Sequence, residues 1–235
     1  MSHKRKPYTS DLSDAQWEKM RELLPLDYRG PGRPIELDMR EVINAIWCRD
    51  GTWERVNRAL YIEARHQVGR CAHSSAAMID TQSVKTTEVG GERGYDAGKK
   101  VKGRKRHILV DSLGHLLKVV VHRADIQDRD SAKLLLTALL PILGLRLLKI
   151  WVDGCYRGSL VAWCRQHLKI ALEIVSPPPH HKGFVVLPKR WVVERTFAWL
   201  GNYRRLSKDY EESTQHSKGA IYIASIQTLL KRLAS

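Results

Sequence analysis

The chain has 235 residues, of which 43% are hydrophobic and 28% are charged, and its formal net charge is +15. This hydrophobic fraction supports a packed core and excludes a disordered polyelectrolyte, and the length suits one catalytic domain with a small appendage. Because the excess cations are clustered along the chain, the charge predicts a polyanionic partner, and we expect nucleic acid.

The cysteines and the N-terminal segment exclude further classes of protein. The four cysteines form no C-x-x-C pair and match no zinc spacing, so we expect neither a zinc site nor a disulfide framework. The basic N-terminus lacks the apolar run of a signal peptide, and no stretch is long enough to cross a bilayer. We therefore expect a protein of the reducing cytoplasm that does not interact with membranes.

The first 72 residues are expected to form a small helical segment. Ser10 or Ser13 can cap its first helix, because a hydroxyl accepts from the free amides of a first turn, and Pro25 ends that helix. Residues 29–34 are rich in Gly and Pro, which predicts a loop. The helices are predicted over residues 14–24, 38–48 and 52–68.

From residue 76 onward the pattern changes to alternating strands and helices. Residues 76–80 are predicted to form a short strand, and residues 107–111 and 116–122 the two strands of a hairpin. The Gly- and Lys-rich segment 86–103 is predicted to be a loop. The remaining elements are a helix over 128–143, a strand over 147–153, a helix over 158–168, a strand over 171–175, and helices over 188–206 and 218–233. This order predicts an α/β fold with a mixed sheet flanked by helices.

Three acidic residues stand out by their position in these elements. Asp80 ends the first strand, Asp153 ends the strand 147–153, and Glu194 lies in the helix 188–206. Carboxylates suit Mg²⁺, and two ions about 3.5–4 Å apart can hold the attacking and leaving oxygens of a phosphodiester in line. Each residue alone has an ordinary alternative: the two aspartates as turn formers, and Glu194 as a surface ion pair with Arg190.

Two basic stretches are predicted to contact phosphates, because closely spaced cations give salt-dependent affinity for nucleic acid. The first, for which a solvated loop is the alternative, contains Lys99, Lys100, Lys102, Arg104, Lys105 and Arg106. The second surrounds Glu194, and its predicted DNA contacts are Arg190, Arg195, Arg204 and Arg205. Trp191, Trp199 and Tyr203 lie among the cations of the second stretch, where they can stack on unpaired bases or pack into the core.

Six segments carry long, specific motifs. They are IDTQSVK (79–85), GYDAGKK (94–100), KGRKRH (102–107), VDGCYRG (152–158), RWVVERTFAWL (190–200) and YRRLSKDYE (203–211). These motifs resemble those of the transposases of the IS five group of bacterial insertion sequences. The likeness extends over nearly everything from Ser75 to the C-terminus, and the first 46 residues resemble the helical N-terminal segment of that group.

The resemblance implies an RNase H-like core in which Asp80, Asp153 and Glu194 form a catalytic triad that binds two Mg²⁺ ions, with Mn²⁺ as a substitute. It implies an enzyme that cuts DNA at the element's ends and joins the freed 3′-hydroxyl to target DNA. The basic residues would position phosphates without reading bases. We accordingly expect a homodimer assembled on DNA in a bacterial nucleoid, with a helical segment at 1–72 and a catalytic domain at 73–235.

One departure from the family lies in the N-terminal segment. Relatives carry a Trp- and Tyr-rich segment before the helix that begins with GTWER (51–55), whereas here residues 46–50 run directly into it. We therefore infer an internal deletion near residues 46–51. It leaves the three acidic residues in place and affects the segment expected to recognise element ends and to assemble the dimer.

Two other functions fit the same residues. A catalytically inactive, deletion-bearing remnant would bind DNA with strong salt dependence but would not cut it with any metal. An RNase H-like nuclease would nick DNA without joining strands and without a requirement for specific ends. Terminal inverted repeats in the DNA flanking the gene would favour a mobile element, whether active or inactive.

Overall fold

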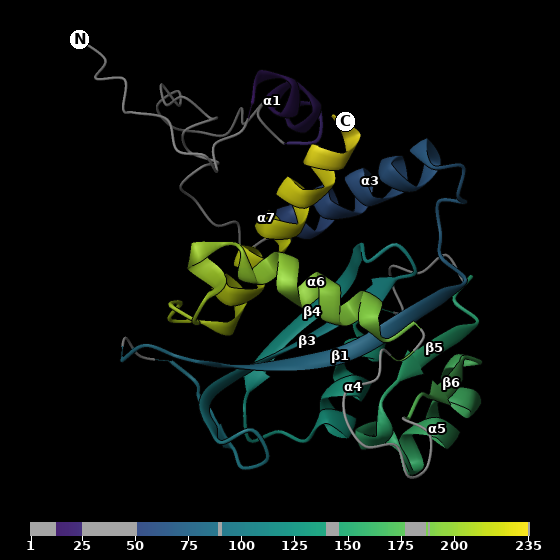
Figure 1. Cartoon of the computed structure of the whole chain (residues 1–235), viewed down its shortest axis with the longest axis vertical. Coiled ribbons are helices and arrows are strands. Elements are labelled where there is room, and N and C mark those ends of the chain that lie inside the picture. The colour runs from purple at the N-terminus through teal and green to yellow at the C-terminus, as the bar shows by residue number, and fades with distance from the viewer. Residues whose placement is uncertain are drawn as a thin grey trace, which may run out of the picture.

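The computed structural model describes residues 13–24, 51–88, 91–139, 146–176, 187 and 189–234. These residues form a six-stranded mixed sheet with helices over both faces (Figure 1). The strands are β1 (Ala76–Lys85), β2 (Gly94–Asp96), β3 (Val101–Asp111), β4 (Leu116–Arg123), β5 (Lys149–Val152) and β6 (Ala171–Ile174). The helices are α1 (Asp14–Arg21), α3 (Thr52–Gln67), α4 (Asp128–Thr137), α5 (Ser159–Trp163), α6 (Trp191–Gly201) and α7 (Thr214–Leu233).

Strand β1 is central and joins two halves of the sheet. On one side it pairs antiparallel with β3, whose other edge pairs with both β2 and β4. On the other side it pairs parallel with β5, which pairs parallel with β6. The order β4–β3–β1–β5–β6, antiparallel and then parallel, with helices on both faces, is the RNase H-like α/β arrangement that the sequence resemblance predicts.

Successive side chains of β1 point alternately to the two faces of the sheet and pack into two separate parts of the core. Ala77 and Ile79 pack with residues of α4 and α5, whereas Met78 packs with residues of α3, α6 and α7. Successive side chains of a strand point to opposite faces, so Asp80 shares its face with Met78. This parity places Asp80 on the side of the sheet that α6 covers.

The N-terminal helices pack against the rest of the chain. Ser13 caps α1 in a capping box with Gln16, which decides between the two predicted caps. Helix α3 buries Trp53 and Leu60 in a core that also contains residues of α7 and β4. The predicted helix over 38–48 and most of the inferred deletion lie outside the described residues. The division at residue 72 stays a prediction.

The prediction of a loop over 86–103 was wrong in part. The first strand continues to Lys85, the short strand β2 lies within the predicted loop, and β3 begins at Val101 rather than at His107. Gly103 permits this pairing: a Cβ there would lie 2.0 Å from the Val84 carbonyl oxygen. The cations Arg104, Lys105 and Arg106 are compatible with a buried strand because loops and helices beside the sheet supply their partners.

Several predicted helix ends also differ from the structure. The helix over 188–206 is shorter, because α6 ends at Gly201 and a separate 3₁₀ turn follows at Arg204–Leu206. Helix α7 begins at Thr214 rather than at residue 218, because Ser213 caps it by accepting from the His216 amide. No helix in the described ranges is long and apolar enough to span a membrane.

Candidate active site

The three candidate carboxylates come from three elements. Asp80 lies within β1 rather than at its end, Asp153 follows β5 and caps a 3₁₀ turn, and Glu194 lies in the first turn of α6. Strands β1 and β5 are parallel neighbours, and α6 lies across β1 (Figure 1). The fold therefore brings the three residues together.

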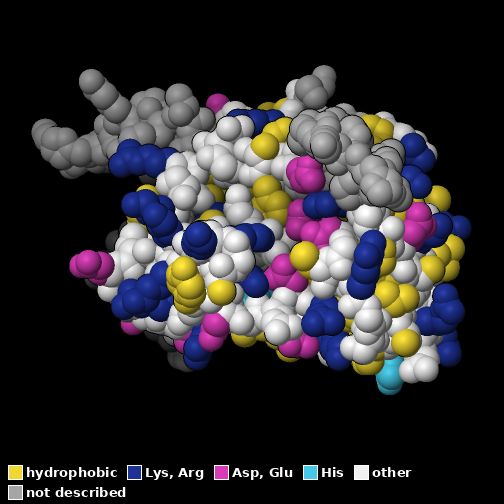
Figure 2. All heavy atoms as spheres, turned by 60° about the horizontal axis from the view of Figure 1, so that its bottom comes forward, with side chains coloured by type: hydrophobic (Ala, Val, Ile, Leu, Met, Phe, Trp, Pro, Cys, Tyr) yellow, Lys and Arg dark blue, Asp and Glu magenta, His cyan; other side chains and the backbone are white. Residues whose placement is uncertain are grey.

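The side chain of Arg190 joins the three carboxylates. Its Nη2 atom lies 3.7 Å from Oδ2 of Asp80, 3.9 Å from Oδ2 of Asp153 and 3.4 Å from Oε1 of Glu194. The Arg190 side chain is 18% exposed, whereas that of Glu194 is 48% exposed. Figure 2 shows acidic side chains gathered near the middle of one face, with Lys and Arg side chains on either side. Three oxygen donors thus converge on one cationic group.

Short hydrogen bonds orient the two aspartates toward that cation. Oδ1 of Asp80 accepts from the Thr81 amide at 2.7 Å, and Oδ1 of Asp153 accepts from the Cys155 amide at 2.8 Å. In both residues the second oxygen, Oδ2, is the one nearest Arg190. The backbone therefore holds one oxygen of each carboxylate and directs the other into the site.

Contacts with the β3–β4 turn hold α6 in place over the sheet. Thr196 Oγ1 donates to the Gly114 carbonyl at 3.0 Å, and Arg195 Nη2 donates to the Leu113 carbonyl at 3.1 Å. Both contacts come from residues within two positions of Glu194 on the same helix. The hairpin therefore determines how closely Glu194 approaches the two aspartates.

Burial raises the pKa of the Asp80 carboxyl to about 6. The Thr81 amide and the Arg190 guanidinium oppose this rise, whereas the charge of Asp153 adds to it. Desolvation and a neighbouring like charge both disfavour the ionised carboxyl, so its charge depends on nearby cations. A divalent cation at this site would act on the Asp80 pKa in the same direction as Arg190 does.

The carboxylates fit a metal by chemistry, although Arg190 holds them at ion-pair distances. Mg²⁺ binds hard oxygen ligands at about 2.0–2.1 Å, closer than any of the three contacts with Arg190. Within the described part of the chain, no three His, Cys, Asp or Glu side chains are arranged to hold a metal ion. For a metal to bind here, the Arg190 guanidinium would have to move away from the three carboxylates, and these would have to move closer to one another.

Residues 73–229 match the model of the transposase DDE domain family. This chain belongs to that family. Over 115 residues it is 32% identical to the "Putative transposase for insertion sequence element IS402" of Burkholderia cepacia, a match that covers 46% of this chain and 54% of the relative. The chain thus spans about half the length of that curated relative. The prediction of an insertion-sequence DDE transposase is confirmed at the level of the family, and placement in the IS five group stays a prediction.

Among solved structures, the catalytic core domain of BIV integrase is similar to the chain. The alignment covers 66% of this chain and 82% of that structure, at 15% sequence identity and a TM-score of 0.41.

The first basic stretch divides into exposed and buried residues. Lys99, Lys100 and Lys102 are exposed, and the Lys99 ammonium donates to the Thr81 carbonyl at 3.0 Å. Arg104, Lys105 and Arg106 are buried in β3. The DNA contacts predicted for this stretch stay a prediction, and Lys99, Lys100 and Lys102 are its exposed members.

The three buried cations of β3, Arg104, Lys105 and Arg106, are all bonded to other groups of the protein. Arg104 forms an ion pair with Asp209 at 3.1 Å and donates to the carbonyls of Glu211 and Glu212. Lys105 and Arg106 are likewise bonded within the protein, to the Asp128 carboxylate and to the carbonyls of Leu206 and Lys208 respectively. In this conformation the three side chains therefore connect strands, loops and α7 to one another.

The second basic stretch remains near the surface. Arg190 contacts the three candidate carboxylates. The guanidinium carbon of Arg195 lies 4.4 Å from the ring centres of both Trp191 and Trp199. Arg204 and Arg205 are exposed. Arg205 Nε also donates to a Glu211 carboxylate oxygen at 2.8 Å.

A buried polar network behind Asp153 was missed at the sequence level. The hydroxyl of Tyr156 and Nε2 of His107 are 3.0 Å apart, and Nδ1 of His107 lies 2.7 Å from the Ser131 hydroxyl. Tyr156 ends the 3₁₀ turn that Asp153 caps, so the network ties this turn to β3 and α4. The motif VDGCYRG contained Tyr156, but nothing local indicated its partner.

Proposed function

We propose that this chain is the catalytic part of an insertion-sequence transposase that cuts DNA at the element's ends and joins the freed 3′-hydroxyl to target DNA. One observation carries the proposal: carboxylates from β1, the end of β5 and α6 converge on a single cation. In a chain of the transposase DDE domain family, these three acidic residues are the candidates for the catalytic triad.

Asp80, Asp153 and Glu194 would hold the metal, Mg²⁺ or Mn²⁺ in its place, as a pair of ions. When bound, such ions stabilise negative charge on the attacking and leaving oxygens of the phosphodiester. The residues fit this role because all three are oxygen donors and already surround a cation. Hydrogen bonds from the Thr81 and Cys155 amides orient the two aspartates before any metal binds.

DNA would approach along the surface that carries both basic stretches. The exposed Lys100 and Lys102 at the β2–β3 turn and the exposed Arg204 and Arg205 after α6 would contact phosphates. Arg190 would contact the scissile phosphate once it leaves the carboxylates. We propose that two copies of the chain assemble on DNA, one at each end of the element.

The test is a cleavage assay on a supercoiled plasmid that carries the gene's flanking DNA, with Mg²⁺ or Mn²⁺. We expect nicking at the element ends, loss of nicking in Asp153→Asn, and unchanged nicking in Asp130→Asn. Asp130 is the matched control because it is an exposed aspartate on α4. Strand joining is followed in the same reaction by the appearance of branched products.

The other outcomes identify the alternatives. Salt-dependent DNA binding without cleavage by the folded chain would contradict transposition and indicate an inactive remnant. Nicking that ignores the element ends and produces no joined strands would indicate a nuclease. Cleavage that survives Asp153→Asn would contradict the assignment of the triad itself.

A further inference from the structure

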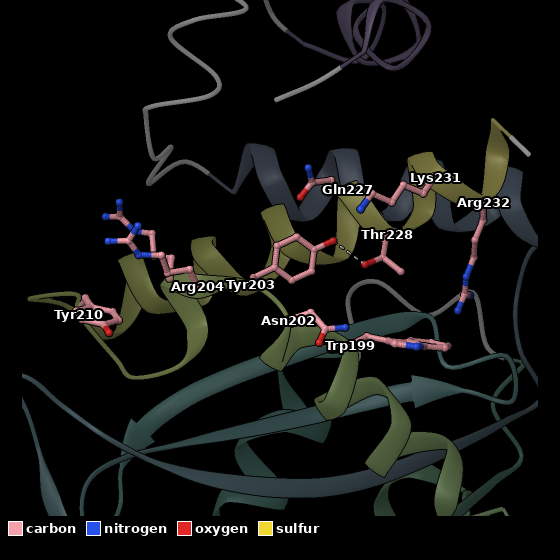
Figure 3. A pocket seen from close by; sticks show the side chains of 10 residues that line it. Trp199, Asn202, Tyr203, Arg204, Tyr210, Gln227, Thr228, Lys231 and Arg232 are labelled. Atoms are coloured by element: carbon pink, nitrogen blue, oxygen red, sulfur yellow. Dashed lines mark hydrogen bonds between the residues drawn. The ribbon is translucent and has the colours of Figure 1, made fainter. Parts of the chain in front are cut away.

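A cavity of about 1080 Å³ lies between the end of α6 and the C-terminal half of α7 (Figure 3). Three aromatic side chains line it: Trp199 on α6, Tyr203 just after that helix, and Tyr210 on the following loop. Tyr210 is 43% exposed. The α6–α7 cavity therefore has flat aromatic walls and an accessible end.

The charge of the α6–α7 cavity is positive. Arg204 and Arg205 line it from the 3₁₀ turn, and Lys231 and Arg232 line it from α7. No Asp or Glu occurs among the described residues that line it, although Arg205 Nε donates to a Glu211 carboxylate oxygen at 2.8 Å. Cations that line a common space favour an anionic ligand.

The aromatic walls are held in place by the protein. Guanidinium carbons of Arg195 and Arg232 lie 4.4 Å and 4.5 Å from the Trp199 ring centre. The Tyr203 hydroxyl is 3.1 Å from Thr228 Oγ1 on α7, and a dashed line marks this hydrogen bond in Figure 3. Because guanidiniums already lie over the Trp199 ring, Tyr203 and Tyr210 are the rings that would offer stacking surfaces to planar ligands. A ring that is already held in place loses little further conformational entropy on binding.

The α6–α7 cavity and the candidate active site share helix α6. Trp199 follows Glu194 by five residues, so the helix rises about 8 Å between them and turns their side chains about 140° apart. A DNA strand that enters the triad and continues around α6 would therefore reach the cavity.

We propose that the α6–α7 cavity binds unpaired nucleotides of the DNA strand next to the cleavage position, by stacking their bases on aromatic rings and pairing their phosphates with its basic side chains. This inference rests on the proposed function and names a substrate subsite for it. The aromatic walls favour unpaired over paired DNA, because a base inside a duplex has no free face for stacking.

The test measures binding of a labelled single-stranded oligonucleotide and of its duplex by fluorescence anisotropy, in EDTA so that no strand is cut. We expect Tyr210→Ala and Lys231→Gln each to weaken single-strand binding by roughly tenfold, the scale of one lost stacking or phosphate contact. Duplex binding should change much less. Tyr210→Phe keeps the ring and should retain single-strand binding.

Matched controls lie on the opposite face of the sheet. Trp163→Ala removes a partly buried aromatic from α5, and Lys133→Gln removes a cation from α4. Both should leave single-strand binding unchanged. Thermal unfolding of every variant separates a lost contact from a lost fold, and Tyr210→Phe provides a second check on folding.

Three results would overturn the proposal: unchanged single-strand binding in both cavity variants, equal losses in the controls, or equal losses for single strand and duplex. Equal losses for single strand and duplex would indicate that the cavity contacts phosphates but does not stack on bases. Asp153→Asn should bind the single strand normally while it fails to cut. If no variant cuts DNA but Tyr210→Ala still loses single-strand binding, the proposed function fails and the cavity assignment stands.

Discussion

The Nη2 atom of Arg190 lies 3.7 Å from Oδ2 of Asp80, at a point that Asp153 and Glu194 also reach. Without such a cation, three carboxylates this close would repel one another. The guanidinium therefore keeps the three carboxylates gathered around one point, and a metal that binds there would compete with it for the same oxygens.

Removing Arg190 should strengthen metal binding in the absence of DNA. We expect Arg190→Gln to bind Mn²⁺ about tenfold more tightly in isothermal titration calorimetry. In the unchanged chain the metal must first displace Arg190 from three partly exposed ion pairs, which contribute at most ~1 kcal/mol each. Arg123→Gln is the control, because it removes an exposed guanidinium from a separate ion pair with Asp125. Equal or weaker Mn²⁺ binding by Arg190→Gln would show that the two cations do not compete.

Arg104 should stabilise the fold rather than contact DNA. Its side chain is fully buried and paired with Asp209, so Arg104→Met leaves a buried carboxylate without its partner. We expect the free energy of unfolding in urea to fall by about 3–5 kcal/mol. The exposed Lys100→Met should change it by less than about 0.5 kcal/mol. A fully stable Arg104→Met variant with weakened DNA binding would contradict this assignment.

The Tyr156 hydroxyl should position Asp153. Tyr156→Phe leaves Nε2 of buried His107 without this partner, which costs about 1–3 kcal/mol of stability. We expect slower cleavage and weaker Mn²⁺ binding, because the 3₁₀ turn that Asp153 caps loses its anchor, while DNA binding is retained. Tyr95→Phe, on an exposed ring of β2, is the control. Loss of stability without any change in Mn²⁺ affinity would indicate a purely structural role.

Buried His115 should make the fold sensitive to acid. Burial lowers the pKa of His115 from 6.5 to about 4, although the charge of Asp111 opposes this shift. The unfolded chain binds a proton below pH 6.5 that the folded chain does not bind until about pH 4. Stability is therefore fully present above pH 6.5 and decreases as the pH falls toward 4, by at most about 3 kcal/mol.

The measurement is urea unfolding between pH 7 and pH 4.5. His115→Gln should reduce the slope of the unfolding free energy against pH, because the titrating group is gone. His66→Gln, on an exposed side chain of α3, should leave the slope unchanged. An unaltered slope in His115→Gln would assign the acid sensitivity to other residues.

Local patterns predicted the elements whose causes lie within a few residues. The Ser13 hydroxyl and the Gln16 side chain cap α1 through bonds three residues apart, and the apolar run before Asp153 forms the parallel strand β5. The extent of α6 was overestimated, because the chain after Gly201 retains helical composition but turns toward α7. The residue at which a helix such as α6 ends depends on packing against elements distant in the sequence.

The cation-rich segment shows where local patterns fail. Arg104 was predicted to contact phosphates, with a solvated loop as the alternative, because its partners Asp209 and Ser217 occur far along the chain. A charged residue can enter a strand only if the fold supplies a buried counter-charge. That condition cannot be read from the neighbours of Arg104 in the sequence.

The sequence by itself determined the family, the order of most elements and three candidate acidic residues, because motifs and periodicity are local properties of a chain. Only the tertiary structure decided that Arg190 lies among those carboxylates, that the inner cations of β3 are buried, and that α6 and α7 enclose an aromatic, cationic cavity. Ion pairs and cavities arise between elements distant in sequence, so their geometry depends on how the whole chain packs.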